Sequence, residues 1–128
     1  NTRRWWPVDG RYWPPGFPRV ATLENFVATF SKWLGYKPCT SEECEPGKEK
    51  IAIFVDAAGI PTHAAKQLEG DGWWKSKLGD NVDIEHELRA VEGRAYGKVR
   101  LIMSRGRWGR FRCRCQMAFW AWRSIPLQ

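Results

Sequence analysis

The chain has 128 residues, of which 43% are hydrophobic and 27% charged, enough for one domain around a single core and too apolar for intrinsic disorder. No apolar run reaches the roughly 18 residues of a membrane span, and nothing resembles a secretion signal, so we expect a cytoplasmic protein without a transmembrane segment. The net charge of +7 is uneven, because residues 1–87 hold 11 basic and 13 acidic residues whereas residues 88–128 hold 10 basic and 1 acidic.

The first 19 residues combine aromatic side chains with four prolines. Because proline lacks a backbone N–H and fixes φ, this stretch favours a loop over a helix or a central strand. We predict an ordered arm whose aromatic rings pack over the core, the alternative being an exposed, adhesive arm. The rings belong to Trp5, Trp6, Tyr12, Trp13 and Phe17.

Residues 23–34 predict an amphipathic helix with one buried stripe. Thr22 precedes the stripe as an expected N-cap, and Gly35 stands where a helix often ends in a left-handed residue. The apolar residues recur at the i, i+3, i+4 and i+7 spacing of a helix. They are Leu23, Phe26, Val27, Phe30, Trp33 and Leu34.

The rest of the domain reads as an antiparallel sheet of about four strands, at residues 50–56, 60–68, 73–78 and 96–103. Residues 83–91 predict a short helix or helical turn, on which His86 would face solvent or cap a local hydrogen bond. We therefore expect an α+β fold with one helix packed on the sheet. The domain would span residues 1–105, followed by a basic, aromatic extension over residues 106–128.

The cysteines favour no metal site, and the glycines favour no nucleotide. Cys39 and Cys44 form a CxxxxC pair and Cys113 and Cys115 a CxC pair, neither of which has the spacing of structural zinc ligands. Free thiols are expected in a cytoplasmic protein, although an even number of cysteines also permits disulfides. No glycine pattern matches a phosphate-binding loop. We expect neither a metal nor another cofactor.

A longer resemblance covers residues 2–105. It rests on the segments RRWW, RYWPPG, TLENFVATFSKWLGY, EPGKEKIAIFVDAAGIPTHAAKQL, GWWKSKLG and DIEH. In this order they resemble an uncharacterised family of small bacterial domains. The segment upstream in that family carries an Asn-Cys pair on a helix, similar to the nucleophile helix of papain-like and NlpC-like cysteine peptidases and amidases. The resemblance therefore implies a papain-like partial fold and thiol chemistry.

The resemblance assigns the general base of that chemistry to His63. In a thiol hydrolase a histidine accepts the thiol proton, and a polar third group holds the imidazole in the useful tautomer. Gln67 and Ser76 are the candidates for this third group, and spacing does not choose between them. The sequence starts after the place of the family's cysteine, so we expect an inactive domain as given. Cys39 is a poor substitute, because we expect it in a loop beyond the C-terminus of the helix, where the dipole opposes a thiolate.

The C-terminal extension supports a second hypothesis from another class, a non-enzymatic binding or assembly module. Its basic and aromatic residues would dock the protein to a larger complex or a polyanion. Through residues 105–123 the partner would be nucleic acid, an anionic membrane surface or another protein. Alternatively, the extension folds against the domain itself. The residues concerned are Arg105, Arg107, Trp108, Arg110, Phe111, Arg112 and Arg114.

Overall fold

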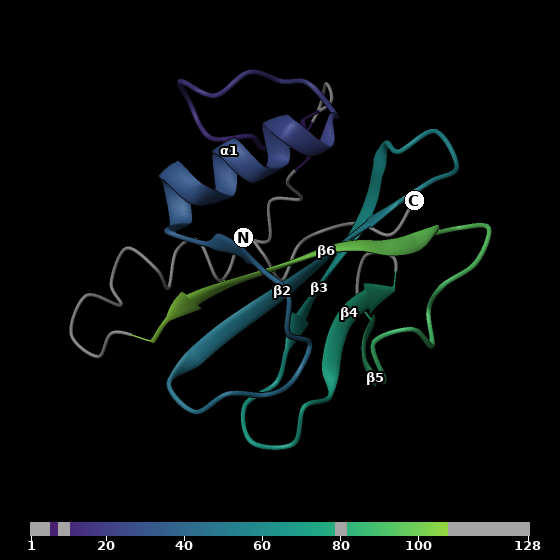
Figure 1. Cartoon of the computed structure of the whole chain (residues 1–128). Coiled ribbons are helices and arrows are strands. Elements are labelled where there is room, and N and C mark those ends of the chain that lie inside the picture. Colours follow the sequence, from purple (N-terminus) through teal and green to yellow (C-terminus); the bar gives the residue numbers. More distant parts are fainter. Residues whose placement is uncertain (1–5, 8–10, 79–81, 108–128) are drawn as a thin grey trace.

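The computed structural model describes residues 6–7, 11–78 and 82–107 (Figure 1). Within these residues the chain forms one helix and six strands, so the predicted α+β class is confirmed. No helix in this part of the chain is long and apolar enough to cross a membrane. In chain order the elements are α1 (Leu23–Leu34), β1 (Lys37–Cys39), β2 (Lys48–Val55), β3 (Pro61–Gln67), β4 (Trp74–Leu78), β5 (Val82–His86) and β6 (Lys98–Gly106).

Helix α1 begins and ends where the sequence predicts. The side chain of Thr22 accepts a hydrogen bond from the backbone N–H of Asn25 at 3.2 Å, which satisfies one of the free donors at the helix start. Gly35 adopts φ 76° and donates its N–H to the carbonyl of Ser31 at 3.0 Å. This left-handed cap closes the last turn, as the glycine predicts.

The strands join in a single antiparallel sheet with the order β1-β6-β2-β3-β4-β5. The described residues thus contain six strands, and the prediction of about four is corrected. One addition is β1, which pairs with β6 through Pro38 and Met103. Proline lacks the donor that a central strand needs, but it is tolerated at the edge that β1 occupies.

The other addition is β5, which occupies the first part of residues 83–91, where a short helix or helical turn was predicted. Ile84 and His86 pair with Ser76 and Trp74 of β4. This places the two residues on the same face as their partners, and His86 is buried there. The segment fits a period of two as well as a helical period, and pairing with β4 decides between them. Turns follow at residues 88–91.

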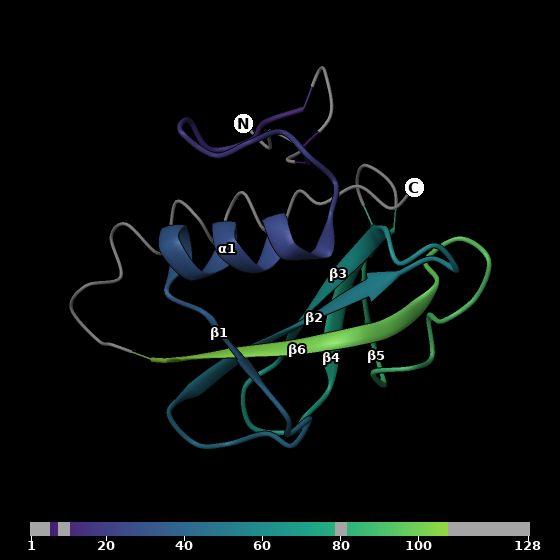
Figure 2. The ribbon, with the colours of Figure 1, turned by 45° about the horizontal axis from the view of Figure 1, so that its top comes forward.

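Helix α1 lies over one face of the sheet, and the N-terminal arm passes over the helix (Figure 2). The ring of Phe26 lies 4.9 Å from that of Trp6 and 5.4 Å from that of Trp13. For the described part of the arm, the prediction that its aromatic rings pack over the core is confirmed. The buried members of this core are Trp6, Trp13, Phe26, Phe30, Tyr36, Ile51, Ile53, Ala64 and Met103.

The opposite face of the sheet holds a second core and most of the buried polar side chains. Residues paired across neighbouring strands share a face, so Phe54 and His63 lie together, as do Gln67 and Trp74. Leu88 and Val91, from the segment after β5, pack against this second core. Residues 41–45 also bond to side chains of this face. The candidate catalytic residues therefore lie on the face away from α1.

Candidate functional site

Strands β3 and β4 bring together two of the three candidate catalytic residues. His63 Nε2 lies 2.8 Å from Ser76 Oγ, within hydrogen-bonding distance. Both side chains are enclosed, with 0% of His63 and 2% of Ser76 exposed. The antiparallel pairing of β3 and β4 puts both side chains on one face of the sheet. His63 therefore has a polar partner from a neighbouring strand, as expected for the third group.

A second histidine, His86, extends the contact to strand β5. Its Nε2 lies 2.6 Å from Ser76 Oγ, and its Nδ1 lies 2.6 Å from the backbone carbonyl oxygen of Glu87. His86 is only 5% exposed, so of its two predicted places the solvated face is wrong, whereas the contact with Glu87 is the local hydrogen bond of the alternative. The alternation of acidic and less polar residues in residues 82–86 was the signal for a half-buried strand. The result is a hydrogen-bonded chain across three strands, from His63 through Ser76 to His86.

The ring of His63 lies in an aromatic environment. Its centroid is 5.2 Å from that of Phe54 and 4.8 Å from that of Tyr96. Burial, and secondarily the nearby His86, lower the pKa of His63 from 6.5 to about 3. The imidazole is therefore neutral at neutral pH. Among the described residues, no hydrogen-bond partner faces its Nδ1.

Gln67, the other candidate for the orienting group, contacts the loop before β2 and not His63. It lies four residues along β3 from His63, which is roughly 13 Å in an extended strand. Its Nε2 donates a hydrogen bond to the carbonyl oxygen of Glu42 at 2.8 Å. Of the two candidates left open by the sequence, the structure places Ser76 at the imidazole and Gln67 at the acidic loop.

The acidic loop, residues 40–47, is fixed to the sheet by a buried ammonium group. Lys50 Nζ donates hydrogen bonds to the carbonyl oxygens of Ser41 at 2.9 Å and Glu43 at 2.6 Å, and lies 2.8 Å from a carboxylate oxygen of Glu45. Glu42 pairs with Arg89 at the loop's outer side. The hydrogen bond from Arg89 holds the pKa of the Glu42 carboxyl below its usual range. The acidic loop and the segment after β5 are thus joined to each other.

Comparison with protein families matches residues 1–104 to a family described as a domain of unknown function, DUF7689. The chain belongs to the DUF7689 family. No curated protein and no solved structure matches the chain. Membership in the DUF7689 family names no activity, so the chemistry has to follow from the residues of the site.

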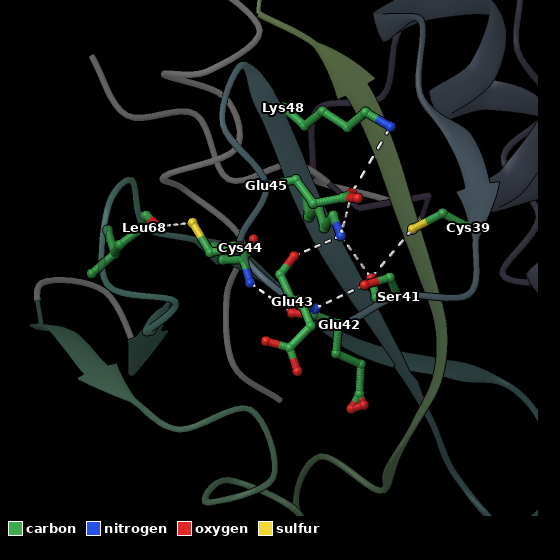
Figure 3. Close-up of polar contacts among 10 residues, drawn as sticks. Cys39, Ser41, Glu42, Glu43, Cys44, Glu45, Lys48 and Leu68 are labelled. Carbon is green, nitrogen blue, oxygen red and sulfur yellow. Dashed lines mark hydrogen bonds and ion pairs between the residues drawn. The ribbon is translucent and has the colours of Figure 1, made fainter.

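The cysteines that the structure describes in this DUF7689 domain are free. Leu68, which Cys44 contacts, is five residues along the chain from His63, roughly 16 Å in an extended strand. Cys39 is in β1 and not in the predicted loop; β6 and β2 separate it from β3, a distance of roughly 14 Å at the usual strand spacing. Cys39 Sγ lies 3.6 Å from the carbonyl oxygen of Ser41, and Cys44 Sγ lies 3.9 Å from that of Leu68 (Figure 3). Cys113 and Cys115 lie outside the described residues. Among those described, no cluster of His, Cys, Asp or Glu could hold a metal ion.

Two of the residues proposed to bind a polyanion lie within the described part of the DUF7689 chain. Arg105 lies 2.8 Å from Glu49 and donates to the carbonyl oxygen of Leu34 at 2.7 Å. Arg107 pairs with Glu69 and lies 3.8 Å from Glu49. Both guanidinium groups therefore connect parts of the domain. The remaining proposed residues, Trp108, Arg110, Phe111, Arg112 and Arg114, lie outside the described residues.

Proposed function

We propose that this domain carries the general-base half of a thiol hydrolase site, of the papain-like cysteine peptidase or amidase class. His63 is the base and Ser76 is its orienting group. The observation that carries the proposal is the difference between the two ring nitrogens of His63. Nε2 is bonded to Ser76, whereas Nδ1 faces no partner among the described residues. A base that is held through one nitrogen has the other available for a proton, and a cysteine thiolate beside Nδ1 would favour the protonated ring that burial alone disfavours at neutral pH.

The reaction would use these atoms in a fixed order. A cysteine thiol gives its proton to His63 Nδ1, and the thiolate attacks the carbonyl carbon of an amide. The imidazolium then gives the proton to the leaving amine, and water releases the acyl group in a second step. Neither Cys39 nor Cys44 is within reach of His63, so the thiol comes from outside the described residues.

Thiol labelling of the longest natural polypeptide that contains this chain tests the proposal. We expect iodoacetamide to label one cysteine at least about tenfold faster than the others, because a paired imidazole favours the thiolate. His63→Gln should bring this rate down to that of the other cysteines, and the matched change Gln67→Ala should leave it unchanged. Circular dichroism establishes that each variant is folded. Absence of a fast cysteine, or a fast cysteine indifferent to His63→Gln, would contradict the proposal.

The enclosure of the site favours a second candidate, a non-enzymatic binding or assembly module. His63 and Ser76 have almost no exposed surface, so the described residues leave little of the site accessible to a substrate. The concentration of positive charge in residues 88–128 then points to an anionic partner.

Deletion of residues 108–128, which leaves β6 intact, tests this candidate. Binding to a single-stranded oligonucleotide or to anionic vesicles should weaken with added salt and disappear on deletion. Binding of neither probe at low salt, or binding that survives the deletion, would contradict it.

A further inference from the structure

We propose that His86 is a positioning residue: with the Glu87 carbonyl, it sets the direction of the hydrogen-bonded chain so that His63 Nδ1 carries a bare lone pair. This inference rests on the proposed function, in which His63 is a base. It explains how Nδ1 of His63 is kept without a proton, as a base requires. Its evidence is separate, since it comes from the three contacts of His86 and Ser76 and from no property of a cysteine.

The backbone carbonyl of Glu87 determines which groups donate and which accept along the hydrogen-bonded chain. A carbonyl oxygen only accepts hydrogen bonds, so the contact at 2.6 Å requires a proton on His86 Nδ1. In a neutral imidazole the other nitrogen then has no proton and accepts. His86 Nε2 is therefore an acceptor, and the group 2.6 Å away from it is the hydroxyl of Ser76.

The hydroxyl of Ser76 transmits this direction to His63. A serine hydroxyl has one proton, and here it points to His86 Nε2. Toward His63 the Ser76 oxygen can then only accept, so the contact at 2.8 Å requires a proton on His63 Nε2. Because His63 is neutral, its Nδ1 is left without a proton. The tautomer of a ring in β3 is thus set by a carbonyl beyond the end of β5.

The opposite direction would need a second proton on His86. His86 Nε2 would then donate to Ser76, Ser76 would donate to His63 Nε2, and the proton of His63 would lie on Nδ1. That N–H would be a buried donor facing no acceptor among the described residues, beside the rings of Phe54 and Tyr96. The first direction leaves the same nitrogen unpartnered, but it needs no second proton on His86, because Glu87 holds the one proton of a neutral ring on Nδ1. The contact between His86 and the carbonyl of Glu87 therefore supports the first direction.

For catalysis, this tautomer means that Nδ1 is the atom of His63 that accepts a proton. When His63 Nδ1 accepts a thiol proton, the ring becomes an imidazolium that still donates Nε2–H to Ser76. The Ser76 hydroxyl remains turned toward His86, so its oxygen presents lone pairs to the new positive charge. His86 acts on the reaction only through Ser76 and touches neither thiol nor substrate.

The test is the tautomeric state of both rings, measured by long-range proton–nitrogen NMR on the ¹⁵N-labelled chain at neutral pH. The chain has 2 histidines, so the spectrum contains two imidazole patterns. We expect opposite tautomers, with the proton on Nδ1 in His86 and on Nε2 in His63. The variant His86→Gln assigns the patterns, since it removes one of them. A wild-type His63 with its proton on Nδ1 would overturn the inference, whatever happens to the variants.

Two variants separate positioning from a merely structural role. In His86→Phe no acceptor remains at the Nε2 position, so the Ser76 hydroxyl should turn toward His63 and move its proton to Nδ1. In His86→Gln a side-chain oxygen can accept from Ser76, and His63 should keep its proton on Nε2. Ser31→Ala, a serine change in α1 on the other face of the sheet, should alter neither ring. A His63 tautomer that is the same in the folded His86→Phe variant as in wild type would overturn the inference.

The result is distinguishable from that of thiol labelling. Opposite tautomers without a reactive cysteine would support the positioning role of His86 and contradict the hydrolase. A reactive cysteine that depends on His63, together with a proton on Nδ1 of His63, would support the hydrolase and contradict the positioning role of His86.

Discussion

Lys50 shows how a single charged residue can hold a loop in place. Its side chain is fully buried, and its ammonium donates to two carbonyl oxygens of the acidic loop. We expect Lys50→Met to lower the free energy of unfolding by about 2–4 kcal/mol, because both carbonyls lose a charged donor. Urea denaturation measures the change. The matched variant Lys48→Met removes an exposed ammonium 3.9 Å from Glu45 and should cost less than about 0.5 kcal/mol. Equal costs would mean that Lys50 does not hold the loop.

Gly97 allows a close approach between two backbone segments. It has φ 75°, and a Cβ at this position would lie 1.9 Å from the carbonyl oxygen of Val55. We expect Gly97→Ala to destabilise the protein by more than about 3 kcal/mol, since the clash is with backbone that cannot move independently. Gly35 has nearly the same φ but open space around it. Gly35→Ala should therefore cost only about 1 kcal/mol, and thermal unfolding of the two variants compares them. Similar losses would show that φ alone matters.

At the scale of elements, α1 owes its stability to its buried stripe. Phe30 has no exposed surface, and its ring packs edge-on to Phe26 at 5.8 Å. We expect Phe30→Ala to lower the free energy of unfolding by on the order of 3–5 kcal/mol, through lost burial and the cavity that remains. The control Lys32→Ala changes an exposed residue of the same helix and should cost less than about 0.5 kcal/mol. A loss below about 1 kcal/mol for Phe30→Ala would contradict the assignment of Phe30 to the core.

The elements also show which features a sequence can predict. The limits of α1 were predictable, because Thr22 and Gly35 are local signals that act within a few residues. The edge strand β1 was not, since its three residues, including Pro38, become a strand only by pairing with the distant β6. The pattern of residues 83–91 fits both the period of a strand and that of a helix, and no local signal in the sequence decides between the two.

The candidate site was also predictable only in part. The family resemblance assigned the base to His63 and left Ser76 as one of two candidates for its partner, and these two side chains are in contact. Ser76 could not be preferred over Gln67, because that choice depends on the register between β3 and β4. His86 was missed because its segment was assigned to a helix, on which it would not face β4.

At the scale of the whole molecule, the site makes the stability of the fold depend on pH. In the folded chain the pKa of His63 is lowered by burial, and secondarily by His86, from 6.5 to about 3. Between these values the unfolded chain binds a proton that the folded chain does not, so stability decreases as pH falls. The pKa values of Glu42 and Glu49 are also lowered, from 4.5, and these carboxylates reduce stability only in more acidic solution. The range from pH 6.5 to 4.5 is therefore suited to isolating the contribution of His63.

We expect the wild type to lose about 2 kcal/mol of unfolding free energy between pH 6.5 and 4.5 through His63, at up to 1.36 kcal/mol per pH unit. Urea denaturation at several pH values measures the loss. His63→Gln retains an amide N–H that can donate to Ser76 but does not titrate. Its stability should consequently depend less on pH in this range, and the difference between the two profiles gives the contribution of His63. Parallel profiles would mean that His63 titrates alike in the folded and unfolded chains, and that its ring is not enclosed as the structure shows.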